Sequence, residues 1–136
     1  MIFRTITIKD HERLIPFWKD NYFVKELDAY ESFKLFLEKN VDLSLLAEDN
    51  GNIVGTVLGS FDGRRGYIQK LVVRKDYRKQ GLGKQLLEQV IIKLRTVGAL
   101  YIPINVEKEL THFYEKSGFK KTKQIPMNIS YSTYNK

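Results

Sequence analysis

Two glycines, Gly81 and Gly83, stand between an apolar segment and a stretch with helical apolar spacing, in the string Arg78-Lys79-Gln80-Gly81-Leu82-Gly83-Lys84. Glycine lets the backbone approach a ligand closely and adopt positive φ angles. The first turn of a helix offers amide N–H groups without helical partners, at the positive end of the helix dipole. A strand, a glycine turn and a helix start in this order predict a seat for a phosphate or pyrophosphate group.

The spacing excludes two common phosphate-binding loops. A dinucleotide-binding fingerprint needs a third small residue at position 86, which is Leu86 here. A P-loop needs glycine at position 78 and a hydroxyl residue after Lys84, but the chain has Arg78 and Gln85. The predicted phosphate-binding loop therefore belongs to neither of these two types.

The string Arg78-x-x-Gly81-x-Gly83 resembles the acetyl-CoA pyrophosphate loop of the GNAT superfamily of N-acetyltransferases. The preceding Leu71-Val72-Val73 is similar to the strand with which these enzymes bind the pantetheine arm. Farther along, Phe113-Tyr114-Glu115-Lys116-Ser117-Gly118-Phe119 resembles a second signature of the family. The stretches around residues 59–73 and 104–106 are similar to the small stand-alone bacterial members.

This resemblance implies an acetyl-CoA-dependent enzyme that moves the acetyl group directly to a primary amine in a ternary complex. The backbone N–H of Leu71 would face the thioester carbonyl, and Val73 would pair with the pantetheine arm. The residues expected to bind the cofactor are Leu71, Val72, Val73, Arg78, Lys79, Gln80, Gly81, Leu82, Gly83 and Lys84.

Tyr114 matches the family tyrosine that donates a hydrogen bond to the departing CoA thiolate. A phenol has a pKa near ~10 and a thiol one near ~8.5, so full proton transfer is uphill by about 2 kcal/mol. Tyr114 is therefore expected to stabilise the thiolate by a hydrogen bond, and it is the one predicted catalytic side chain.

The group that removes the proton from the acceptor amine stays open. An alkylamine with a pKa of ~10.4 is cationic at neutral pH, and removing its proton costs about 4–5 kcal/mol. Relatives often carry a glutamate near the middle of the cofactor strand, where this chain has Tyr67 and Gln69. Glu48 is a remote candidate. A separate departure from the family is Glu107, seven residues before Tyr114, where many relatives carry an asparagine that contacts pantetheine or the acceptor.

Composition restricts the chemistry further. The chain has 136 residues, which predicts one N-acetyltransferase domain over residues 1–136. It contains no cysteine, which excludes a disulfide, a thiolate metal site and an acyl-cysteine intermediate. Its two histidines, His11 and His112, are too few and too far apart to predict a metal site. No apolar run approaches the ~18 residues of a membrane span, so we expect a cytoplasmic protein without a membrane partner.

The formal net charge is +7, and residues 64–84 hold eight basic residues against Asp76. Because this basic excess surrounds the predicted helix start, it favours phosphate binding. Residues 26–62 hold eight acids against Lys34 and Lys39. The acidic excess predicts a cationic acceptor, such as a polyamine, an aminoglycoside-like molecule or a lysine-bearing peptide.

The periodicity of apolar residues predicts an α+β (mixed α/β) fold. The resemblance implies the GNAT fold, a mostly antiparallel sheet of six to seven strands flanked by about four helices. The expected strands are 2–8, 43–48, 53–61, 67–74 and 100–106, followed by two final strands. Two expected helices follow Asp10 and Asp28, each in the helix-cap position, a third begins at about Lys79, and a short one runs through Tyr114.

Two other functions remain as alternatives. A CoA-binding sensor would keep the cofactor site but have little catalytic activity, which would explain the missing base. A basic nucleic-acid-binding module is disfavoured, because the aromatic residues follow core periods instead of interleaving with the bases. The acceptor would be a small-molecule or peptide amine, and the sequence is compatible with a homodimer.

Overall fold

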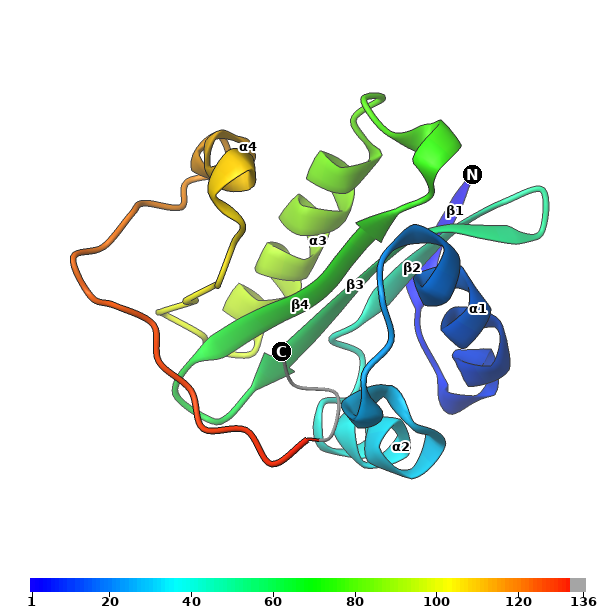
Figure 1. The fold of residues 1–136 in the computed structure, drawn as a ribbon, viewed down its shortest axis with the longest axis horizontal. Coiled ribbons are helices and arrows are strands. Elements are labelled where there is room, and N and C mark those ends of the chain that lie inside the picture. Colours follow the sequence, from blue (N-terminus) through cyan, green and yellow to red (C-terminus); the bar gives the residue numbers. More distant parts are fainter. Residues whose placement is uncertain (133–136) are drawn as a thin grey trace.

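A computed structural model describes residues 1–132 of the protein. Four antiparallel strands form one sheet in the order β1-β2-β3-β4 (Figure 1). They are β1 (Ile2–Thr5), β2 (Leu45–Asp49), β3 (Asn52–Phe61) and β4 (Gly66–Val73). The predicted fold class and the antiparallel character of the sheet are confirmed.

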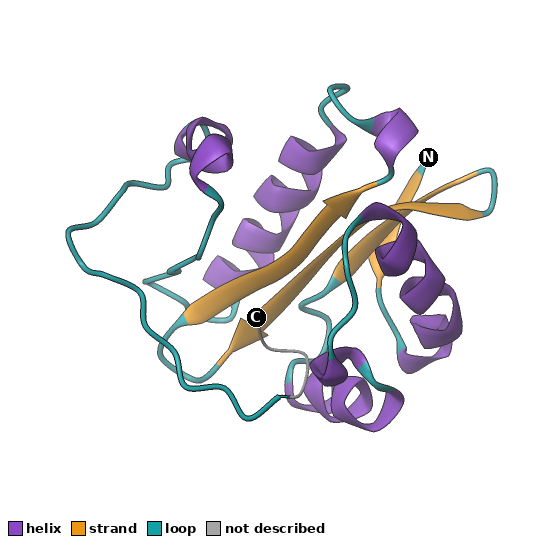
Figure 2. Ribbon diagram, viewed as in Figure 1, coloured by secondary structure: helices purple, strands orange, loops and turns teal. Residues whose placement is uncertain are grey.

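Helices cover both faces of this sheet (Figure 2). Helices α1 (His11–Asn21) and α2 (Tyr30–Lys39) lie on one face, and α3 (Leu82–Thr96) lies on the other. Side chains alternate between two buried clusters along β2, so that Leu45 and Ala47 pack toward α3 while Leu46 packs toward α1. The short α4 (Thr111–Glu115) follows a 3-10 turn at Lys108–Leu110 and completes the four predicted helices of the described range.

A β-bulge interrupts β4 at its centre. Thr56 of β3 pairs with Val72, but Leu58 pairs with Gln69, so that Lys70 and Leu71 together oppose one residue of β3. Lys70 has a φ of 51°, in the left-handed region that a lysine seldom adopts. A bulge bends a strand and redirects its side chains. The bulge therefore changes the direction of β4 at the segment that the sequence predicts to bind the cofactor.

The sheet has fewer strands than the six to seven predicted. Residues 100–106 contribute a single bridge, between Arg65 and Tyr101, and then separate from β4. After Phe119, residues up to 132 form no strand. In that stretch the apolar side chains are 80 to 92% exposed, at Ile125, Met127, Ile129 and Tyr131. Their alternation is typical of a strand, but no neighbouring strand pairs with them within residues 1–132.

The start of α2 differs from the prediction for a physical reason. Asp28 was expected to cap α2, but the helix begins at Tyr30 with Ala29 before it. The Asp28 carboxylate instead accepts a hydrogen bond from the backbone N–H of Lys25, 2.8 Å away, and closes a 3-10 turn. Asp10 acts similarly at Thr7 and forms an ion pair with Arg4. Within the described range, no helix has the length and apolar character needed to cross a membrane.

Candidate functional site

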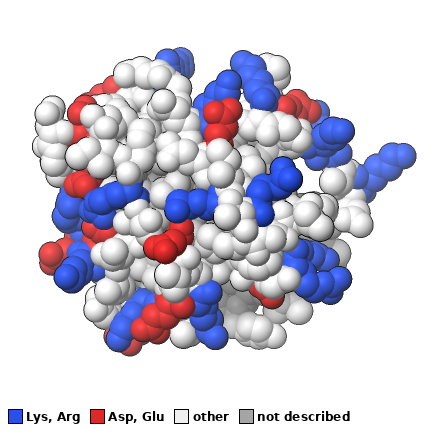
Figure 3. Space-filling view, turned by 180° about the vertical axis from the view of Figure 1, so that it is seen from behind, with Lys and Arg blue, Asp and Glu red and all other residues white. Residues whose placement is uncertain are grey.

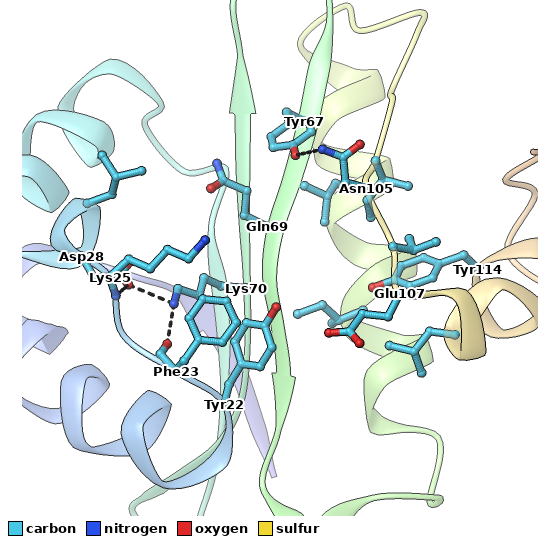
Figure 4. A pocket seen from close by; sticks show the side chains of 16 residues that line it. Tyr22, Phe23, Lys25, Asp28, Tyr67, Gln69, Lys70, Asn105, Glu107 and Tyr114 are labelled. Carbon is cyan, nitrogen blue, oxygen red and sulfur yellow. Dashed lines mark hydrogen bonds and ion pairs between the residues drawn. The ribbon is translucent and has the colours of Figure 1, made fainter. Parts of the chain in front are cut away.

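A cavity of about 370 Å³ opens between β4 and the segment 104–107 that has separated from it (Figure 4). The loop that follows α1 closes a third side, where Tyr22 and Phe23 line the cavity. Tyr67 and Asn105 join the two longer walls by a hydrogen bond of 3.4 Å between the asparagine amide and the tyrosine hydroxyl. The bulge in β4 lies at this cavity, because both of its residues contribute to the lining.

Tyr114 lies on the wall of this cavity, where α4 meets the sheet. Its ring is held edge-on between Phe113 and Phe119, at centroid distances of 5.0 and 5.8 Å. No residue of the described range forms a hydrogen bond with its hydroxyl. Burial raises the pKa of Tyr114, and the charge of a nearby Tyr22 would raise it further. The phenol therefore stays protonated at neutral pH and can donate a hydrogen bond to an anion formed in the cavity.

In the predicted cofactor strand, some side chains pack in the core and others line the cavity. Leu71 lines the cavity, whereas the Val72 side chain is buried in the cluster beneath α1. Val73 packs on the opposite face, against the cluster beneath α3. Only the backbone of Val72 and Val73 could therefore meet a ligand. The hydroxyl of Thr56 braces the bulge by donating a hydrogen bond of 2.9 Å to the Lys70 carbonyl.

The predicted phosphate seat lies at the start of α3. Gly81 precedes the helix with a φ of 86°, and Lys79 also has a positive φ, of 63°. Within residues 1–132, the backbone N–H groups of residues 79–84 donate no hydrogen bond, and the first intrahelical bond across the turn runs from Gln85 to Gly81. The side chain of Leu82 is buried, which fixes the helix end against the sheet. These amides and the helix dipole form a site suited to an anion.

Gly83 brings the phosphate seat and Tyr114 together. A β-carbon at this position would lie 3.4 Å from the Phe113 ring and 3.5 Å from the side chain of Val73. These are ordinary van der Waals distances, and they show that Phe113 of α4 packs close to the first turn of α3. The spacing of the two motifs in the sequence thus becomes a direct contact in the fold.

Arg78 forms hydrogen bonds within the protein. Its guanidinium donates hydrogen bonds of 2.9 Å to the carbonyl of Val73 and 2.9 Å to the carbonyl of Asn21. The side chain therefore joins the end of β4 to the end of α1. The side-chain amide of Gln80 donates to the Asp76 carbonyl at 3.1 Å. These two side chains shape the loop, while its backbone amides remain available to a ligand.

Lys70 is a site residue that sequence reasoning missed. Its side chain is 9% exposed, and its ammonium lies 2.9 Å from an Asp28 carboxylate oxygen and 2.7 Å from the Phe23 carbonyl oxygen. The same nitrogen lies 4.9, 5.4 and 4.7 Å from the ring centroids of Trp18, Tyr22 and Phe23. Burial lowers the pKa of Lys70, and the bond to Asp28 opposes that effect. The one signal that could have identified it was a lysine directly before the apolar run Leu71-Val72-Val73 of a predicted strand.

Glu48, the remote candidate base, does not reach the cavity. Its carboxylate accepts hydrogen bonds of 2.8 Å from Arg4 and 3.1 Å from Arg13, and these bonds hold its pKa below the usual range. Of the eight acids in residues 26–62, only Asp28 lines the cavity. The described residues contain no cluster of three or more histidine, cysteine or acidic side chains that could hold a metal ion.

The surface charges are mixed on the face seen from behind Figure 1. Basic and acidic side chains lie next to one another there, without a continuous patch of either sign among the described residues (Figure 3). This face offers no broad basic surface of the kind that binds nucleic acid.

Residues 10–128 match the model of the acetyltransferase (GNAT) domain. The chain belongs to the GNAT acetyltransferase family. It is therefore an acetyltransferase of a family that uses acetyl-CoA, and the family resemblance of the sequence motifs is confirmed. The resemblance implies six to seven strands, and the sheet has four within residues 1–132. The strands that are missing from these residues are those expected after β4.

Solved structures of acetyltransferases share the fold of the chain at low sequence identity. Glucosamine-6-phosphate N-acetyltransferase from Arabidopsis thaliana superposes with a TM-score of 0.74 at 21% identity, covering 96% of this chain and 97% of that one. A Trypanosoma brucei acetyltransferase gives a TM-score of 0.72 at 20% identity, with coverages of 94% and 99%. A predicted acetyltransferase from Clostridium acetobutylicum, solved with acetyl-CoA, gives 0.72 at 19%, with coverages of 93% and 95%.

The buried contacts of Lys70 predict a large effect on stability. Lys70→Met should lower the free energy of unfolding by about 3 to 5 kcal/mol, because it leaves the Asp28 carboxylate buried without its cation. Lys34→Met, which changes an exposed lysine of α2, should stay within about 0.5 kcal/mol of the parent. Urea unfolding measures both. The double variant Lys70→Met/Asp28→Leu should recover part of the lost free energy of unfolding, because it removes the unpaired carboxylate as well. Equal stability of Lys70→Met and Lys34→Met would show that the ion pair does not hold the loop.

Proposed function

We propose that this chain transfers the acetyl group of acetyl-CoA directly to a primary amine, in a ternary complex formed at the cavity beside β4. The observation that carries the proposal is the position of the Tyr114 hydroxyl. It lies unpartnered on the cavity wall, on a helix that packs against the anion-binding start of α3. In the proposed site Tyr114 is catalytic, and the cofactor is bound by residues 71–73 and 78–84.

The residues present fit acetyl-CoA at both ends. The amides of residues 79–84 and the positive φ of Gly81 suit a pyrophosphate at the start of α3. The bulge exposes Leu71 to the cavity, where its backbone N–H is our proposed partner for the thioester carbonyl. A preorganised N–H at such a position stabilises the oxyanion by up to a few kcal/mol, about 3 in comparable acyl transfers. Lys79 and Lys84 would add positive charge near the phosphates.

The proposed reaction needs no covalent intermediate on the protein. The amine nitrogen bonds to the acetyl carbonyl carbon, the carbon–sulfur bond breaks, and CoA leaves as a thiolate. Tyr114 donates a hydrogen bond to that thiolate and keeps its own proton, because burial raises the pKa of its phenol. The nitrogen of a cationic amine loses two protons, one when the ammonium becomes the attacking amine and one when the amide forms, and both pass to water at the cavity.

We propose a cationic amine as the acceptor, either a small molecule or a peptide. The acidic excess of residues 26–62 gives little support, since most of those carboxylates lie away from the cavity. The support comes instead from Glu107, an exposed carboxylate of the cavity wall. We further propose that residues 1–136 form one N-acetyltransferase domain in the cytoplasm, and that exposed apolar side chains between Ile125 and Tyr131 favour a homodimer.

Substituting Gly81 tests the phosphate seat. In Gly81→Val the new side chain meets no protein atom within 4 Å, but it strains a φ of +86° and projects from the loop that should receive the pyrophosphate. Affinity for acetyl-CoA should fall at least tenfold, which is about 1.4 kcal/mol. Isothermal titration calorimetry measures the change.

Gly63→Val provides the matched control, because Gly63 has a φ of +96° and also meets nothing within 4 Å, but lies in the turn between β3 and β4. This variant should bind acetyl-CoA like the parent. A folded Gly81→Val protein with the affinity of Gly63→Val would contradict the proposed cofactor site.

Tyr114→Phe tests the leaving-group role. The variant should keep its affinity for acetyl-CoA but lose at least about tenfold in kcat, because only the hydrogen bond to the thiolate is removed. Since the phenol of Tyr114 has a raised pKa, the ratio of the two rates should stay constant between about pH 6 and 9. Tyr101→Phe, outside this cavity, is the control. Equal turnover of Tyr114→Phe and the parent would assign the role to water.

A further inference from the structure

Two carboxylates line the cavity, those of Asp28 and Glu107. Asp28 is already neutralised by the protein, because its oxygen lies 2.9 Å from the Lys70 ammonium and 2.8 Å from the backbone nitrogen of Lys25. Among residues 1–132, no cation forms an ion pair with Glu107, and its side chain is exposed. Glu107 therefore contributes the one uncompensated negative charge of the lining.

Glu107 lies at a defined place relative to Tyr114. Its carbonyl accepts a hydrogen bond of 2.9 Å from the backbone N–H of Leu110, which closes the 3-10 turn at Lys108–Leu110. That turn leads directly into α4, which carries Tyr114. The spacing between the carboxylate and the proposed leaving-group residue is thus set by one continuous, hydrogen-bonded stretch of chain.

The Glu107 carboxylate extends from its segment toward Tyr22 on the opposite wall, and Tyr114 stands on the same side as Glu107 (Figure 4). The proximity has an electrostatic consequence, because burial raises the pKa of Tyr22 and the negative charge of Glu107 raises it further. Tyr22 therefore stays neutral and cannot itself supply a charge to a ligand. A cationic group between these walls would meet Glu107 as its anionic partner.

We propose that Glu107 binds and orients the amino group of the acceptor, and thereby selects cationic amines. A carboxylate forms a charge-assisted hydrogen bond with an ammonium or amine N–H, roughly twice as strong as one between neutral groups. Held there, the nitrogen lies on the side of the cavity that Tyr114 lines, where the thiolate would leave. This proposal rests on the proposed acetyl transfer and names the residue that recognises its acceptor.

Other lining groups do not offer the same recognition. The ammonium groups of Lys25 and Lys70 would repel a cation, although Lys70 is paired. Tyr67 and Gln69 line the cavity as neutral groups and can only add hydrogen bonds. Glu107 could instead serve only to stabilise the 3-10 turn that it precedes. Glu109 lies in the same turn but does not line the cavity, so it separates a role in the turn from a role in the cavity.

Binding of 1,4-diaminobutane to the CoA-saturated protein tests the inference by calorimetry, independently of turnover. Glu107→Gln should weaken this binding at least tenfold, whereas Glu109→Gln should bind the diamine like the parent. The zwitterion 4-aminobutanoate, of similar length, should bind the parent more weakly than the diamine. That preference should shrink in Glu107→Gln.

Equal binding of the diamine by the parent and Glu107→Gln, or no binding by the parent, would overturn the role of Glu107. Titration of acetyl-CoA into the same three proteins separates this failure from that of the proposed function. All three should bind acetyl-CoA with the parent affinity, because neither Glu107 nor Glu109 belongs to residues 71–73 or 78–84, to which we assign the cofactor. Absence of acetyl-CoA binding in the parent would contradict the acetyl transfer itself.

Discussion

The buried ion pair between Lys70 and Asp28 is the interaction on which the cavity depends. It joins the bulge of β4 to the loop after α1, two segments that are distant in the sequence. The aromatic rings of Trp18, Tyr22 and Phe23 surround the ammonium and thereby place two of those rings on the cavity wall. An unpaired charge buried at this depth would cost several kcal/mol, about 3 to 5. The loop that carries Asp28 is therefore held beside Lys70.

The second constraint acts on the other side of β4. Phe113 packs close to Gly83 in the first turn of α3 and brings Tyr114 beside the amides that we propose to bind the pyrophosphate. Arg78 reinforces the arrangement by bonding to the ends of β4 and α1. The proposed cofactor loop and Tyr114 are therefore positioned by packing between α3 and α4, whereas the opposite wall of the cavity is positioned by a charge pair.

Local motifs predicted the parts of the site that depend on local backbone geometry. The glycine loop and Tyr114 could be read from spacing, and the family match confirms the resemblance that they carry. Lys70 and Tyr22 gave no such signal, since their importance comes from contacts between distant segments. Asp28 was misread as a helix cap, because a carboxylate that caps a helix and one that closes a 3-10 turn share the same local pattern. The strand count was too high because apolar alternation predicts a strand but cannot supply its partner.

The most direct measurement follows both products of the proposed reaction. Acetyl-CoA and a panel of primary amines, including 1,4-diaminobutane, are incubated with the protein, and free CoA thiol and acetylated amine are quantified together. The account predicts one thiol released for each acetylated amine, with the cationic amines as the preferred acceptors. Tight binding of acetyl-CoA without amine-dependent thiol release would contradict it and would favour a CoA-binding sensor.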